Sequence, residues 1–236
     1  MITILILAAG KNSHPSEMDY PLCLTEIKGK NLLELILNSC RNFQKNIVVA
    51  LDEQERKLFF LDNIVKILNS EAQIFSVPEN TAGAACTALL STNYIQENDE
   101  LLIINTNQFV DLDLELPIEY FRSNNLDAGT VIFQSINSRY SFVQISEQNL
   151  VIEAAEKRVI SNWATAGIYW YKHGIDFVES CKETIIKDAR VNNKFYICPT
   201  LNEMILNQKT VGVYKIDSEK YLPLKNERQI HLVELK

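Results

Sequence analysis

Cysteine and histidine are scarce and scattered in this chain of 236 residues, which argues against two kinds of structural site. The five cysteines form no Cys-x-x-Cys pair, and their odd number argues against a disulfide framework. The three histidines stand at no zinc-ligand spacing from a cysteine, so no structural zinc site is expected. Buried thiols behave as small apolar side chains. We therefore expect core positions for the cysteines, which are Cys23, Cys40, Cys86, Cys181 and Cys198.

Long apolar runs and clustered positive charge are also absent. The longest mostly apolar run, residues 2–9, is far short of the roughly 20 residues that span a bilayer. It has no basic leader before it, and we expect a buried first strand, no membrane span and a cytoplasmic protein. The formal net charge is −7, with no basic run interleaved with aromatics, so nucleic acid is not an expected partner.

Strand and helix patterns alternate through the first half of the chain. Buried strands are predicted at 2–7, 46–51, 73–77 and 100–105, and helices at 31–42 and 52–68. A small-residue segment that begins at Thr81 is predicted to continue as a helix to about residue 93. Asp52 and Glu55 form a capping box at the start of the second helix. This order predicts an α/β fold, a Rossmann-like three-layer sandwich with a mostly parallel mixed sheet. Ligands of such sheets bind beyond the carboxyl ends of the strands.

The second half is more mixed. Short strands at 128–134, 141–145 and 150–154 predict an antiparallel excursion from the sheet. A strand at 166–171, a helix ending near 188, a helix at 200–207 and a strand at 210–216 follow. Because no linker or repeat divides these pieces, residues 1–236 are interpreted as one domain.

Two motifs near the start of the chain carry a resemblance to a known family. Leu5 to Lys11 reads LILAAGK, and Leu24 to Leu37 reads LTEIKGKNLLELIL. Together they resemble the sugar-phosphate nucleotidyltransferases, which transfer a nucleoside monophosphate from a nucleoside triphosphate to a sugar phosphate or polyol phosphate. The resemblance implies a role in surface polysaccharide synthesis and a homodimer. It implies nucleotide contacts from Leu7, Ala8, Ala9, Gly10, Lys11, Asn80, Thr81, Ala82, Gly83 and Asn105.

The acceptor side of the resemblance lies later in the chain. Glu156-Lys157-Arg158 resembles a family Glu-Lys-Pro motif whose lysine contacts the acceptor phosphate, and Gly167 begins a similar Gly-Ile-Tyr strand. The resemblance implies catalytic roles for Lys11 and Lys157. The implied substrate-binding residues are Asn107, Glu156, Lys157, Gly167 and Tyr196.

The chain departs from the family pattern at three cationic or acidic positions. Residues 12–15 contain no arginine, Leu22 replaces a lysine, and Asn107 stands where an aspartate would hold Mg²⁺. The expected metal is Mg²⁺ at Asn107 and Asp111, although an amide oxygen brings no charge to the ion. Loss of one electrostatic stabiliser costs roughly 2.7–4 kcal/mol of transition-state binding.

These departures leave two alternatives to a working nucleotidyltransferase. One is a catalytically impaired nucleotide-binding relative that acts as a partner subunit. The other is a glycosyltransferase that holds a metal and a nucleotide sugar through Asp111 and Asp113, an Asp-x-Asp pair just after the fourth strand. If the chain is instead a working nucleotidyltransferase, other charged residues must replace those that are missing, and the candidates are Lys11, His14, Asp111, Asp113, Lys157 and Arg158.

Overall fold

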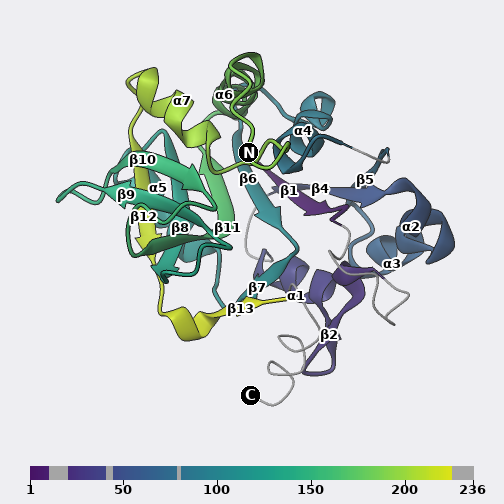
Figure 1. The fold of residues 1–236 in the computed structure, drawn as a ribbon. Helices are drawn as coiled ribbons and strands as arrows, with labels where there is room; N and C mark the ends of the chain where they lie inside the picture. Colours follow the sequence, from purple (N-terminus) through teal and green to yellow (C-terminus); the bar gives the residue numbers. More distant parts are fainter. Residues whose placement is uncertain (11–20, 41–44, 79–80, 225–236) are drawn as a thin grey trace.

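The first strand, β1 (Ile2–Ala8), lies in the interior of a mixed sheet and is buried along its whole length. It pairs in parallel with β4 (Lys45–Asp52) on one side and with β6 (Glu100–Asn105) on the other, and β5 (Gln73–Val77) pairs in parallel with β4. Helices cover both faces, which explains the near-continuous apolar run of β1. The computed structural model describes residues 1–10, 21–40, 45–78 and 81–224 (Figure 1).

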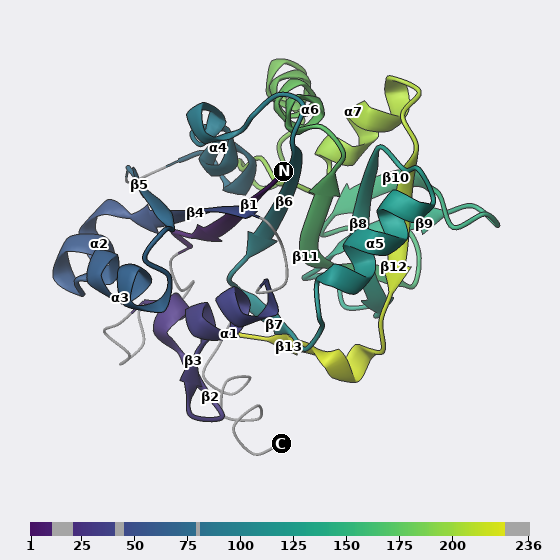
Figure 2. The same cartoon turned by 180° about the vertical axis from the view of Figure 1, so that it is seen from behind.

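Helices lie on both faces of the sheet, as the opposite views in Figures 1 and 2 show, and an apolar layer fills the space on each side. One layer packs against α1 (Leu32–Ser39), α3 (Leu61–Leu68) and α5 (Glu115–Ser123). The other packs against α4 (Ala84–Leu89), α6 (Gly174–Ile186) and α7 (Thr200–Leu206). The three-layer α/β class predicted from the sequence is confirmed.

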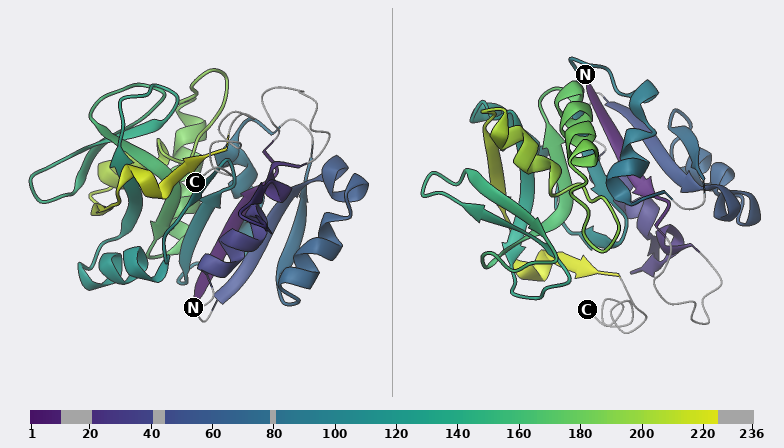
Figure 3. Two further views of the ribbon diagram at one scale, coloured as in Figure 1. Left: turned by 90° about the horizontal axis from the view of Figure 1, so that it is seen from below. Right: turned by 45° about the horizontal axis from the view of Figure 1, so that its top comes forward.

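The antiparallel half is arranged around β11 (Trp163–Tyr171). Its second part pairs with β6, whereas its first part extends past the end of β6 and meets β9 (Ser141–Ile145). Both parts pair with β8 (Ala128–Gln134), and a register shift lies between Thr165 and Tyr169. β10 (Val151–Glu156) pairs with β9, and β12 (Val211–Lys215) pairs with β8. The predicted antiparallel excursion is therefore present beside the parallel strands, as Figure 3 shows from two further directions.

Small elements complete the described chain. A two-stranded ribbon joins β7 (Gln108–Val110) to β13 (Tyr221–Pro223). A second ribbon joins β2 (Glu26–Ile27) to β3 (Lys30–Asn31). Single 3-10 turns are η1 (Leu22–Leu24), η2 (Thr92–Tyr94) and η3 (Ser218–Lys220).

Two helix predictions need correction. The helix predicted at 52–68 is two helices, α2 (Glu53–Leu58) and α3, because Phe60 between them has a left-handed backbone with φ of 52°. The predicted cap is confirmed, since the Asp52 carboxylate accepts from the Gln54 and Glu55 amides. Helix α5 was not predicted. Its Pro117 lies in the first turn, where a missing N–H costs nothing.

Core positions were predicted for the cysteines, and the structure largely confirms them. All five are free thiols, four are buried, and Cys86 is partly exposed. Burial raises the pKa of Cys23 from its usual 9.0 to about 12, with a further rise from the nearby Glu55 charge. Within the described ranges, no helix combines the length and the apolar character that crossing a membrane requires.

Candidate functional site

The carboxyl edge of the parallel strands brings several predicted residues together. Leu7 of β1 pairs with Asn105 of β6, and Ile168 of β11 pairs with Ile104, so Gly167 lies beside the end of β6. Beyond the buried Ala8, the chain becomes progressively exposed through Ala9 to Gly10. This is where an α/β sheet binds ligands. Lys11, His14 and Asn80 lie outside the described residues.

A threonine that sequence reasoning missed joins the two central strand ends. Thr106 is 3% exposed, and its hydroxyl donates to the Leu7 carbonyl at 3.0 Å. The bond crosses from the end of β6 to the end of β1, immediately before the Ala8 to Gly10 turn. No sequence pattern marks it, because a lone threonine after a strand is common and its partner is 99 residues away.

The second small-residue segment packs against the chain itself. Gly83 has φ of 117°, and a Cβ there would lie 2.3 Å from the Phe195 carbonyl oxygen. The Phe195 amide donates to the Ala82 carbonyl at 2.7 Å, and the Ala85 amide donates back to Phe195 at 3.2 Å. Thr81 shares a hydroxyl hydrogen bond of 2.8 Å with Thr87. Glycine at 83 is therefore explained by close backbone packing, and nucleotide contact by Thr81, Ala82 and Gly83 stays a prediction.

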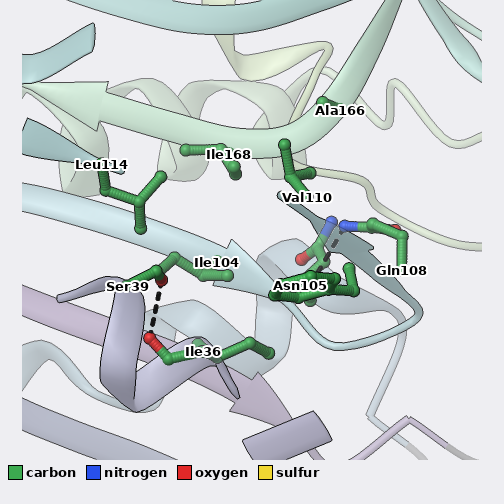
Figure 4. A pocket seen from close by; sticks show the side chains of 10 residues that line it. Ile36, Ser39, Ile104, Asn105, Gln108, Val110, Leu114, Ala166 and Ile168 are labelled. Atoms are coloured by element: carbon green, nitrogen blue, oxygen red, sulfur yellow. Dashed lines mark hydrogen bonds between the residues drawn. The ribbon is translucent and has the colours of Figure 1, made fainter. Parts of the chain in front are cut away.

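A similar close approach surrounds Gly167. The Gln108 side chain is nearly buried and donates to the Asn105 carbonyl at 3.1 Å. A Cβ on Gly167, where φ is 71°, would lie 2.0 Å from the Gln108 Nε2 atom. Figure 4 shows Asn105 and Gln108 beside a small hollow between α1, β6, β7 and β11. Its other walls are mostly apolar, including Ile104, Val110 and Ile168, which suits packing better than phosphate binding.

The residues predicted to hold Mg²⁺ lie at opposite ends of β7. The Asn107 Oδ1 atom is buried without a hydrogen-bond partner in the described structure. Asp111 is exposed, and the carboxylate of Asp113 accepts from the Glu115 amide at 3.0 Å, at the start of α5. Among the described residues, no three His, Cys, Asp or Glu side chains form a group that could hold a metal. One neutral and one charged oxygen do not fit the donor set that Mg²⁺ prefers.

The acceptor-side residues form the most organised part of the site. Lys157 has φ of 53°, and its amide donates to the Tyr140 carbonyl at 3.1 Å. Its Nζ atom donates to the Tyr196 hydroxyl at 2.9 Å and lies 5.0 Å from the centroid of the Tyr196 ring. Tyr196 directly follows Phe195, which packs on Gly83. The hydrogen-bond partner of Lys157 is therefore the residue next to that contact.

A nearly buried polar cluster lies beneath Lys157. Glu156 is 8% exposed and accepts a short hydrogen bond from the Ser141 hydroxyl. Tyr169 shares a hydrogen bond of 2.9 Å with Thr165. Burial, and secondly the Glu156 charge, raises the pKa of the Cys198 thiol, and burial likewise raises the pKa of Tyr169. Both groups are therefore neutral near pH 7 and make poor proton acceptors, so the charge in this region comes from carboxylate and ammonium groups.

Arg158 is engaged outside this cluster. Its guanidinium forms an ion pair of 2.5 Å with Glu153, and both side chains are largely exposed. Lys11 and His14 lie outside the described residues, and Arg158 pairs with Glu153. Lys157 is therefore the cation that contacts another predicted site residue in the described part of the chain, namely Tyr196.

Comparison with known proteins identifies the family of this chain. The model of the family described as nucleotidyl transferase matches residues 5–209. The chain belongs to the nucleotidyl transferase family.

Two curated relatives of this nucleotidyl transferase are similar over much of its length, and both are called bifunctional protein GlmU. The protein from Methanococcus maripaludis is 23% identical over 72% of this chain and 40% of the relative. The protein from Methanococcus vannielii is 22% identical over 89% of this chain and 49% of the relative. The chain thus spans less than half the length of either relative.

Solved structures share the fold of this nucleotidyl transferase. A nucleoside-diphosphate-sugar pyrophosphorylase from Vibrio cholerae RC9 has a TM-score of 0.84 and 18% identity, with both chains covered completely. A UDP-glucose pyrophosphorylase complexed with UDP-glucose has a TM-score of 0.80 and 16% identity, over 100% of this chain and 98% of that one. A putative glucose-1-phosphate thymidylyltransferase from Bacillus anthracis has a TM-score of 0.75 and 16% identity, over 100% and 94% of the two chains. At these identities the likeness shows the fold, and it confirms the predicted fold class.

Proposed function

We propose that this protein transfers a nucleoside monophosphate from a nucleoside triphosphate to a sugar phosphate or polyol phosphate, with release of pyrophosphate. Membership of the nucleotidyl transferase family supports the reaction class. The structural neighbours described as pyrophosphorylases and as a thymidylyltransferase support this substrate class. A product of this kind would supply an activated sugar for surface polysaccharide synthesis.

The observation that carries the proposal is the position of Lys157. Its ammonium donates to the Tyr196 hydroxyl at 2.9 Å just after the end of β10, and Tyr196 directly follows Phe195, whose amide donates to the carbonyl of Ala82 in the predicted nucleotide-binding segment. A fixed ammonium can bind an acceptor phosphate and reduce the repulsion between it and the triphosphate. The turn at Ala8 to Gly10, which follows the end of β1, would present small residues and backbone N–H groups to the nucleotide.

The chemical step needs positioning and charge neutralisation. An oxygen of the acceptor phosphate forms a bond to the α-phosphorus, and the bond from that phosphorus to the oxygen bridging it to the β-phosphorus breaks. The electron pair leaves with pyrophosphate. Lys157 would hold the attacking phosphate in line with the leaving group, and proximity of this kind accounts for much of the barrier reduction in two-substrate reactions.

Pyrophosphate release from a panel of triphosphates and sugar phosphates, with Mg²⁺ or Mn²⁺ present, tests the proposal. Lys157→Ala should lower kcat/KM for the sugar phosphate by roughly a hundredfold or more, since one transition-state stabiliser is lost. Binding of the triphosphate should be unchanged. The matched control is Lys215→Ala, because the Lys215 ammonium lies 4.9 Å from the Trp163 ring and donates to Asn149 at 2.6 Å.

Equal turnover in Lys157→Ala and wild type would refute the role of Lys157. An equal loss in Lys215→Ala would show that removal of any lysine from an aromatic ring disturbs the fold. No pyrophosphate release from wild type with any pair of substrates would refute the proposed reaction.

Binding without turnover is the second candidate function, and Asn107 favours it. Its amide oxygen stands at the end of β6 where the resemblance places an aspartate, and the described residues include no group of three metal-ligating side chains there. A triphosphate that raises the melting temperature without pyrophosphate release would support this candidate. The Mg²⁺ requirement and the homodimer remain predictions. For the glycosyltransferase alternative, the Asp113 carboxylate accepts from the Glu115 amide, and among the described residues it belongs to no group of three metal-ligating side chains.

A further inference from the structure

Residues 195–202 contact both sides of the candidate site. At the nucleotide side, the Phe195 backbone exchanges hydrogen bonds with Ala82 and Ala85. At the acceptor side, the next residue, Tyr196, accepts from the Lys157 ammonium. The segment then enters α7, and its last residue, Asn202, reaches the strand that leads to Lys157.

Asn202 binds both backbone groups of a single strand residue. Its Oδ1 atom accepts from the Ala154 amide at 2.8 Å, and its Nδ2 atom donates to the Ala154 carbonyl at 2.8 Å. Ala154 belongs to β10, which pairs with β9 along its other edge. The carboxamide therefore occupies the place of a neighbouring strand and satisfies groups that an edge strand otherwise leaves unpaired.

The Ala154 anchor lies three residues before Lys157. Between them, β10 ends at Glu156, and the Lys157 backbone turns with φ of 53° while its amide bonds to Tyr140. The left-handed conformation is unfavourable for a lysine and persists only where surrounding contacts impose it. Asn202 and Tyr196 supply contacts on the backbone and on the side chain from one segment.

We propose that Asn202 is a positioning residue that fixes the end of β10 and so sets the place of the Lys157 ammonium. This inference rests on the proposed function for its kinetic consequence, because a displaced ammonium would bind the acceptor phosphate less well. The backbone link itself does not depend on turnover. Asn202 acts through Ala154 and Lys157 without contacting a substrate.

Kinetics of Asn202→Ala provide the first test. We expect kcat/KM for the sugar phosphate to fall by about 10- to 100-fold, the usual result of a small displacement in a positioned site. The KM for the triphosphate should change less than twofold or so. Asn202→Asp keeps the bond from the Ala154 amide but turns a second acceptor oxygen toward the Ala154 carbonyl, so its loss should be at least as large as that of Asn202→Ala.

Asp127→Ala is the matched control. The Asp127 carboxylate also makes two hydrogen bonds to one residue, accepting from the Thr210 amide and hydroxyl at 2.8 Å each. It precedes β8 beside Lys172, at the edge of the sheet opposite the candidate site. Equal losses for the sugar phosphate in Asp127→Ala and Asn202→Ala would overturn the proposal, because they would reflect general destabilisation.

Amide hydrogen exchange provides a test that needs no turnover. In Asn202→Ala, exchange at the Lys157 amide should accelerate about tenfold more than exchange at the central Leu5 amide of β1. Unchanged exchange at Lys157, or equal acceleration at both amides, would overturn the positioning role. If wild type releases no pyrophosphate, this result still decides the inference on Asn202 while the proposed reaction fails separately.

Discussion

The two sides of the candidate site are built by different means. The predicted nucleotide side consists of small residues at the end of β1 and at the start of α4, and its closest contacts run between backbone atoms, as at Gly83 and Phe195. The acceptor side consists of long polar side chains held by one another, as at Lys157 and Tyr196. Backbone packing tolerates almost no added atom, whereas a side-chain arrangement can lose a member and still fold. Mutations on the two sides should therefore fail in different ways.

Gly83→Ala should produce the largest effect. The added Cβ would meet the Phe195 carbonyl at 2.3 Å on a backbone with φ of 117°, so both steric overlap and backbone strain arise. We expect a loss of about 4 kcal/mol in the free energy of unfolding, measured by urea denaturation.

Gly167→Ala is the matched comparison for Gly83→Ala. Its Cβ would meet the end of the Gln108 side chain, which can rotate away only by giving up its hydrogen bond to the Asn105 carbonyl, and its φ of 71° is one that other residues adopt at a cost of about 1–2 kcal/mol. Equal losses in the two variants would contradict the distinction between backbone and side-chain packing.

The sequence could predict features that depend on neighbouring residues, but not contacts between residues far apart in the chain. The apolar run of β1 and the Asp52 cap depend on local pattern, and both were predicted correctly. The break at Phe60 and the contacts of Thr106 and Asn202 were not, because each depends on residues that only folding brings close. The resemblance named both Lys157 and Tyr196, but it did not predict the hydrogen bond between them, whose two residues are 39 positions apart in the sequence.

Asn107→Asp should sharpen the comparison by adding a charge just beyond the end of β6, where the resemblance places an aspartate. A carboxylate at the end of β6 would supply the acidic oxygen that Mg²⁺ prefers, next to the phosphates of the proposed triphosphate. We expect pyrophosphate release with Mg²⁺ to rise by about a hundredfold, equivalent to about 2.7 kcal/mol.

Asn124→Asp is the control for Asn107→Asp, since Asn124 follows α5 and its exposed amide bonds only to the Tyr120 carbonyl in the described structure. It should leave the rate unchanged. A rate in Asn107→Asp no higher than that of wild type would argue against reacting phosphates near this residue.

Thr106→Val should have the smallest effect on stability, but it should also weaken binding of the triphosphate. Valine keeps the shape of threonine but removes the hydroxyl that donates to Leu7, so the free energy of unfolding should fall by about 1 kcal/mol. Thr130→Val should lose a similar amount, because the fully buried Thr130 hydroxyl donates to the Ile168 carbonyl at 2.9 Å. Only the Thr106 bond joins the strand ends beside the Ala8 to Gly10 turn. Calorimetric titration with the triphosphate should therefore show weaker binding in Thr106→Val alone, and equal weakening in both variants would mean that nucleotide affinity follows overall stability.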